Sequence, residues 1–185
     1  MKVKNSATKY ILKYLATGMG MAIALSSPYG SRKLVRNIIR HYKNKKLKED
    51  YLQRKFYYLR RKKLIEYKDI GKKTFISLTE NGKKQILKYD FEEMKIEKTS
   101  RWDGKWHLVM FDIPQSKKNA RDALRLKLRD LGFLKFNNSV WLYPYECKKE
   151  VDFVAEFFMI GKYVHYAVAE EITNSKTLKK IFCLN

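Results

Sequence analysis

Residues 106–114 read Trp-His-Leu-Val-Met-Phe-Asp-Ile-Pro, a nearly unbroken apolar run that ends in a carboxylate and a proline. Large apolar side chains occupy both even-numbered and odd-numbered positions, whereas a half-exposed strand would alternate apolar and polar residues. We therefore expect a central strand that is buried on both faces. Pro114 cannot donate a hydrogen bond to a sheet ladder, so the strand must end before it and leave Asp112 at its carboxyl end.

The segments after this strand predict an alternation of helices and strands. Ser116 is a good N-cap for the first helix and Gly132 closes it, while Gly161 ends the second. The expected elements are helices at 116–131, 150–158 and 174–182, and strands at 133–136, 140–145 and 163–169. With the first strand, the order is β-α-β-β-α-β, which is that of a ferredoxin-like fold over 101–185.

The first ninety residues predict a separate, mainly helical module. Periodicity and turn signals divide it into short elements. The expected elements are helices at 6–15, 31–43, 49–63 and 80–89, strands at 65–67 and 74–78, and a hairpin turn at 71–73. Thr79 is the expected N-cap of the last helix. Residues 91–100 are charged and weakly periodic, so they are interpreted as a linker, and the predicted fold class of the whole chain is α+β.

The charge of the chain indicates a polyanionic partner. A formal net charge of +22 over 185 residues favours nucleic acid first and an anionic membrane surface second. Residues 1–100 carry 26 of the 41 Lys and Arg but only 9 of the 19 Asp and Glu, so the basic surface belongs mainly to the first module.

The two cysteines indicate the cellular compartment, and one apolar segment raises the question of a membrane span. Cys147 and Cys183 have no CxxC spacing, which argues against a zinc site or a disulfide scaffold and suits a reducing cytoplasm. The apolar segment Tyr14–Leu25 is shorter than the roughly 20 residues that span a bilayer. We therefore expect it to contribute to a core, and we expect no membrane partner.

The order of helices followed by a basic hairpin and a last helix resembles a winged helix-turn-helix, as does the run Phe-Ile-Ser-Leu-Thr-Glu-Asn-Gly-Lys at 75–83. In that fold the helix after the turn, here 49–63, enters the major groove. Leu52, Phe56 and Leu59 form its apolar stripe, so its basic and aromatic side chains point outward. The candidate DNA-binding residues are Arg54, Tyr57, Tyr58, Arg60, Arg61, Lys62, Arg36, Arg40, Lys72 and Lys73. The alternative is that these basic faces are merely solvated.

Four stretches of the second half form a recognisable set. They are Trp106–Pro114, the Arg121/Leu124/Arg125/Leu128 helix face, Gly132-Phe133 and Val140–Pro144. Together they resemble the PaaX repressor family, which joins a winged helix-turn-helix to a domain similar to the small CRISPR adaptation endonuclease. The resemblance implies a transcriptional regulator that binds double-stranded DNA. A winged helix-turn-helix usually binds paired half-sites and a small sheet has open edges that can pair with a second copy, so we expect a homodimer through the ferredoxin-like domain, and we expect no cofactor. PaaX-type repressors usually have a further C-terminal domain, which we expect to be missing here, so the resemblance does not imply control by a coenzyme A thioester.

Asp112 carries the alternative function. In the CRISPR family the aspartate that closes the first strand is the proposed ligand of a divalent metal between two protomers, and Asp112 matches that position. In that case the protein is a Mg²⁺- or Mn²⁺-dependent endonuclease or an accessory of CRISPR adaptation, with Asp112 as catalytic metal ligand. Two other readings make the protein a non-enzyme: Asp112 caps the following loop by hydrogen bonding to backbone N–H groups, or it holds a metal or lies at a dimer interface without turnover. We expect His107 and His165 to be packed or solvated side chains rather than ligands. Cys147 follows a strand end, but nothing in the sequence marks a base beside it that would make it reactive.

Overall fold

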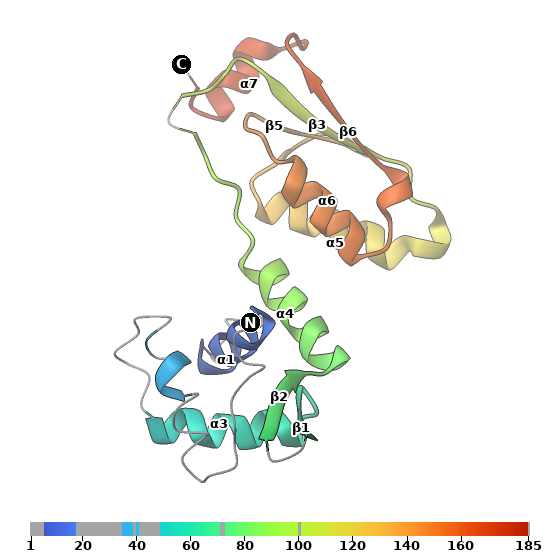
Figure 1. Cartoon of the computed structure of the whole chain (residues 1–185). Coiled ribbons are helices and arrows are strands. Elements are labelled where there is room, and N and C mark those ends of the chain that lie inside the picture. The colour runs from blue at the N-terminus through green and yellow to red at the C-terminus, as the bar shows by residue number, and fades with distance from the viewer. Residues whose placement is uncertain are drawn as a thin grey trace. The chain divides into compact units, whose positions relative to one another are not determined.

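The computed structural model describes residues 6–17, 35–38, 40, 49–70, 73–99 and 101–184 (Figure 1). The chain divides into two compact units, Met1–Glu92 and Glu93–Asn185, called unit 1 and unit 2 below. Helices and antiparallel sheets occur together, so the fold class is α+β as predicted. None of the helices in the described ranges is both long and apolar enough to cross a bilayer.

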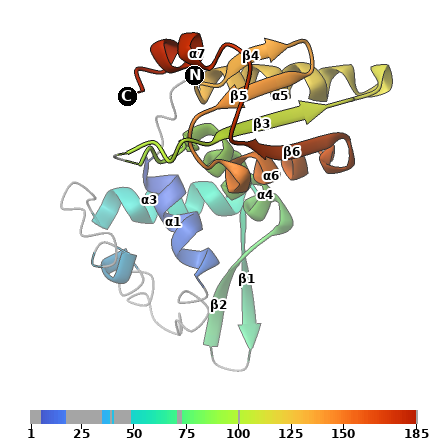
Figure 2. The ribbon, with the colours of Figure 1, turned by 90° about the horizontal axis from the view of Figure 1, so that it is seen from above.

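Unit 1 combines helices with one antiparallel hairpin. Its elements are α1 (Ser6–Ala16), α3 (Glu49–Arg61), β1 (Ile65–Ile70), β2 (Lys73–Leu78) and α4 (Glu80–Glu93). Residues 35–38 and 40 are also helical, while the rest of the helix expected at 31–43 and the apolar segment from residue 18 onward lie outside the described residues. Figure 2 shows the β1–β2 hairpin projecting away from α3.

The core of unit 1 confirms the predicted stripe of α3. Leu52 and Leu59 are fully buried and Phe56 is nearly so, one turn apart along the same side of the helix. They belong to one apolar cluster with Ile11 of α1 and Ile65 of β1. Because this cluster holds one side of α3, the opposite side of the helix is turned to solvent.

Thr79 caps α4 as predicted, and α4 ends later than predicted. The Gly82 N–H donates to Thr79 Oγ1 at 3.1 Å, the bond expected of an N-cap. Gly82 is required there, because a Cβ on it would lie 2.1 Å from the carbonyl oxygen of Leu64. The predicted helix ended at residue 89, but Tyr89 is buried and Asp90 pairs with Lys13 of α1, so the helix continues through the first residues of the expected linker to Glu93.

Unit 2 has the predicted β-α-β-β-α-β order. Its elements are β3 (Trp106–Phe111), α5 (Lys118–Asp130), β4 (Leu134–Asn137), β5 (Val140–Tyr143), α6 (Lys148–Phe157), β6 (Val164–Ala169) and α7 (Ser175–Ile181), with 3₁₀ turns at Gln115–Lys117 and Gly161–Tyr163. The strand order is β4-β5-β3-β6, with every pair antiparallel. The first strand is therefore central, and the topology is ferredoxin-like.

The expectation that β3 is buried on both faces is correct at one end only. Val109 is paired with Trp141, which lines a hollow together with α5, and the Arg125 guanidinium of α5 lies over the Phe111 ring, so these strand residues and His107 are on the face that α5 covers. Figure 1 shows α6 on the same side of the sheet as α5, and α7 on the other side. On that second face Trp106 is fully buried in a cluster with Leu178 of α7. Leu108 and Met110 are only half-buried, because α7 is too short to cover them. Apolar periodicity alone did not distinguish a half-covered face from a closed one.

Three predicted helix ends can be compared with the structure. Gly132 closes α5 as predicted, with a φ of 91° and the Phe133 N–H donating to the Leu128 carbonyl, which satisfies the last turn. Ser116 is not an N-cap, because it lies in the 3₁₀ turn before α5 and Lys117 precedes the helix without a side-chain cap. Gly161 does not end α6 either, since the left-handed residue after that helix is Met159.

Candidate functional site

The solvent face of α3 gathers four of the candidate DNA-binding residues. Arg54, Tyr57, Tyr58 and Arg61 have the spacing i, i+3, i+4, i+7, which places them along one side of a helix. All four are exposed, and the Tyr57 side chain is 70% exposed. Arg54 and Arg61 make no hydrogen bond or ion pair with any residue that the structure describes. Their charges are therefore available to an external anion.

Three further cations, on α3 or directly after it, lie over tyrosine rings. The Arg60 guanidinium carbon is 4.8 Å from the centre of the Tyr67 ring on β1, which directs this side chain toward the hairpin. Lys55 and Lys62 lie 5.4 Å and 6.0 Å from the Tyr58 ring centre. Such contacts hold a flexible cation close to the helix at a small gain in free energy. Burial raises the pKa of Tyr67, so its ring is a neutral platform for Arg60.

The other candidate DNA-binding residues lie on the helical residues before α3 and in the β1–β2 hairpin. Arg36 and Arg40 are exposed on the helical residues at 35–38 and 40. Lys73 begins β2, where its backbone pairs with Ile70, but its side chain is not among those described. Lys72 lies outside the described residues altogether. The Tyr67 platform under Arg60 was missed in the sequence, because nothing local indicates that β1 packs beside this part of α3.

Asp112 is exposed at the carboxyl end of β3. Its backbone N–H donates to the Tyr163 carbonyl at 3.0 Å, while its carboxylate accepts no hydrogen bond from a described residue. The loop-capping interpretation is therefore wrong in its geometry. Arg121 braces the loop instead, donating to the Ile113 carbonyl at 3.4 Å and to Gln115 Oε1 at 3.1 Å. Within the described ranges, no three His, Cys, Asp or Glu side chains are grouped as metal ligands.

A buried polar group links β3, β6 and the start of α6. His107 Nδ1 lies 2.5 Å from the hydroxyl of Tyr166, which is also hydrogen-bonded to Cys147. Burial lowers the pKa of His107 and raises that of the Cys147 thiol to about 12, so both groups are neutral near pH 7. His107 is thus packed and His165 is exposed, the two arrangements expected of a strand histidine, and Cys147 is packed.

The second unit has a counterpart among known protein families. Residues 99–181 match the family model described as the PaaX protein central Cas2-like domain. The matched range runs from just before β3 to the end of α7, and unit 2 is called the Cas2-like unit from here on. The match supports a PaaX-type protein. No curated protein matches the chain.

The two cysteines of the Cas2-like unit are expected to differ sharply in reactivity. Cys183 is exposed, whereas Cys147 is buried with a pKa of about 12. Relative to an ordinary pKa near 9, this reduces the thiolate population of Cys147 by about a thousandfold at pH 8. Titration with Ellman's reagent should therefore show one fast thiol, and a second that reacts only when the unit unfolds.

Serine variants assign these two phases. Cys183→Ser should remove the fast phase and leave the slow one, while Cys147→Ser should do the reverse. Two equally fast thiols in the native protein would contradict the burial of Cys147.

Proposed function

We propose that the protein is a PaaX-like transcriptional regulator, a repressor that binds double-stranded DNA sequence-specifically through unit 1 and acts as a homodimer through the Cas2-like unit. The observation that carries the proposal is the solvent face of α3, where Arg54 and Arg61 flank Tyr57 without protein partners among the described residues. The PaaX-type match of residues 99–181 and the concentration of positive charge in the first hundred residues support it.

The dimensions of α3 suit a winged helix-turn-helix recognition helix. Thirteen residues of α-helix are about 20 Å long, and the major groove is about 12 Å wide and admits one helix. Arg54 and Arg61 are two turns apart on the exposed side, so they would reach base edges or phosphates about three base pairs apart. Arginine pairs with guanine in a bidentate manner, and tyrosine donates to phosphate. In this proposal Lys72 and Lys73 contact the DNA backbone from the hairpin, and Arg36 and Arg40 contact it from the preceding helix.

Dimerisation in the proposal uses the half-covered face of the Cas2-like sheet. Leu108 and Met110 in the central strand are half-buried, and Ala167, opposite Leu108 on β6, is half-buried as well. A second copy of this face would cover these apolar side chains in a two-fold symmetric contact. Two recognition helices would then read half-sites separated by about 10 base pairs or a multiple of it.

The test is a binding selection from sheared genomic DNA at about 0.15 M salt, run in parallel with EDTA and with Mn²⁺. A regulator enriches one discrete site with two related half-sites and leaves the fragments intact under both conditions. Uniform recovery of all fragments would contradict sequence-specific binding.

The same selection tests the endonuclease alternative. The exposed Asp112 carboxylate, which has no partner among the described residues, is the observation that favours it. Fragments shortened only in Mn²⁺, and no longer shortened with Asp112→Asn, would replace the regulator by a metal-dependent endonuclease with Asp112 as the metal ligand.

A further inference from the structure

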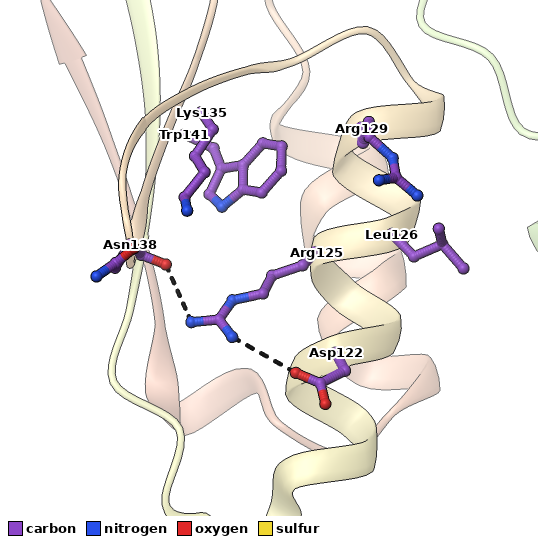
Figure 3. A pocket seen from close by; sticks show the side chains of 7 residues that line it. All are labelled: Asp122, Arg125, Leu126, Arg129, Lys135, Asn138 and Trp141. Atoms are coloured by element: carbon purple, nitrogen blue, oxygen red, sulfur yellow. Dashed lines mark hydrogen bonds and ion pairs between the residues drawn. The ribbon is translucent and has the colours of Figure 1, made fainter.

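A hollow of about 540 Å³ lies between α5 and the β4–β5 hairpin of the Cas2-like unit. Arg125 and Arg129 reach it from consecutive turns of α5, and Lys135 and Trp141 reach it from the sheet (Figure 3). Lys135 on β4 is paired with Trp141 on β5, so their side chains lie next to each other on the face that α5 covers. The volume is within the range of small-molecule sites.

Arg125 is held in a fixed position across this hollow. Its guanidinium donates to the backbone carbonyl of Asn138 at 3.1 Å and to the Asp122 carboxylate at 3.4 Å. These bonds connect α5 to the turn of the β4–β5 hairpin, as the dashed lines of Figure 3 show. The charge of Arg125 is therefore in position before a ligand binds. This reduces the conformational entropy that the Arg125 side chain loses on binding.

Trp141 presents an unused donor to the same space. The residue is 5% exposed, and its indole N–H has no acceptor among the described residues. Figure 3 shows the indole nitrogen turned toward the side of the hollow that holds the Arg125 guanidinium. A buried N–H without an acceptor costs free energy, and two donors directed at one space leave it suited to an acceptor oxygen. This orphaned donor points to a ligand rather than to a solvated basic surface.

The electrostatics of the hollow select an anion of about two charges. Arg129 and Lys135 are exposed and form no hydrogen bond or ion pair with any described residue, so only the Asp122 carboxylate offsets the three cations. Side-chain donors outnumber acceptors around the space. A phosphate monoester carries a charge of about −1.5 to −2 near pH 7 and several strong acceptor oxygens. Leu126, 50% exposed at the rim, offers an apolar contact to the rest of such a molecule.

We propose that this hollow is a binding site for a small molecule that bears a phosphate monoester. Its phosphate oxygens accept hydrogen bonds from the Trp141 indole and from the cations of Arg125, Arg129 and Lys135. The site lies wholly in the Cas2-like unit and does not depend on the DNA-binding function proposed for unit 1, so either proposal can fail without the other.

The experiment follows the tryptophan indole N–H resonances of the ¹⁵N-labelled full chain by NMR. Inorganic phosphate and glycerol 3-phosphate are titrated separately, with sodium chloride at matched ionic strength as the salt control and a short DNA duplex as a competing source of phosphate. Trp141→Phe identifies the Trp141 signal by removing it. Both phosphate probes should shift that signal saturably, and the signals of Trp102 and Trp106 should stay in place.

Charge variants distinguish a built site from general attraction. Arg129→Ala/Lys135→Ala should weaken binding of glycerol 3-phosphate by about tenfold or more, because two charge-assisted hydrogen bonds are removed. The matched control, Lys176→Ala/Lys180→Ala, removes the same charge from exposed positions on α7 and should leave the affinity unchanged. Unshifted Trp102 and Trp106 signals establish that the variants are folded.

Three results would overturn the proposal. Equal affinity for glycerol 3-phosphate in the two double variants would mean an adventitious ion only. A Trp141 shift reproduced by sodium chloride at the same ionic strength would mean the same. A shift produced by the DNA duplex but by neither phosphate probe would make the hollow a binding surface for the nucleic-acid backbone instead.

Discussion

Replacement of Arg54 and Arg61 by alanine together is expected to weaken binding of the selected DNA site by about 100-fold. An arginine that pairs with a base in a bidentate manner contributes about 1–3 kcal/mol of discrimination, and removal of an arginine that binds a phosphate reduces the salt slope of binding by about one. Both side chains are exposed and lie opposite the buried stripe of Leu52 and Leu59, so the fold of unit 1 should be unaffected. Fluorescence anisotropy at several salt concentrations measures the affinity and its salt dependence.

The matched control is Lys84→Ala/Lys88→Ala. These lysines are exposed one turn apart on α4, so the variant removes the same charge from a different helix of unit 1. Its effect should be within about threefold, because only long-range attraction is reduced. Equal effects of the two double variants would show that diffuse positive charge, rather than the solvent face of α3, accounts for binding.

Trp106→Ala is expected to destabilise the Cas2-like unit by about 3–5 kcal/mol, the usual cost of removing a large buried aromatic side chain. Trp106 is fully buried, with its ring centre 4.8 Å from that of Trp102 and 6.1 Å from that of Phe182. It also packs with Leu178, so the cavity would lie where α7 meets the sheet. Urea unfolding followed by tryptophan fluorescence measures the effect on this unit alone, because all three tryptophans lie in it.

Trp106→Phe separates loss of volume from loss of the indole N–H. That N–H is buried and has no acceptor among the described residues, so phenylalanine removes an unpaired donor while it keeps an aromatic ring in the cluster. We expect a cost below about 2 kcal/mol, because the smaller cavity is partly offset by the removal of an unsatisfied polar group. A cost for phenylalanine as large as that for alanine would contradict the expectation that a single aromatic ring at this position retains most of the packing.

The sequence by itself determined the elements whose causes are local. The apolar run at 106–111 predicted a central strand, and β3 does lie between β5 and β6. The spacing of Leu52, Phe56 and Leu59 predicted which side of α3 is buried, and hence which basic residues face solvent. Thr79 and Gly132 marked helix ends correctly, because capping depends on a few neighbouring backbone groups. That the solvent face of α3 binds DNA stays a prediction.

Only the tertiary structure decided the features that depend on residues distant in the sequence. The extension of α4 to Glu93 follows from the Asp90–Lys13 pair, and the half-burial of Met110 follows from the shortness of α7. Local periodicity could not predict that Arg60 lies over the Tyr67 ring. It could not predict either that Trp141 lies next to Lys135 and lines the same hollow as Arg125. Strand register and helix packing set these contacts. A periodic pattern specifies which side of an element is buried, whereas its partner is chosen when the whole chain packs.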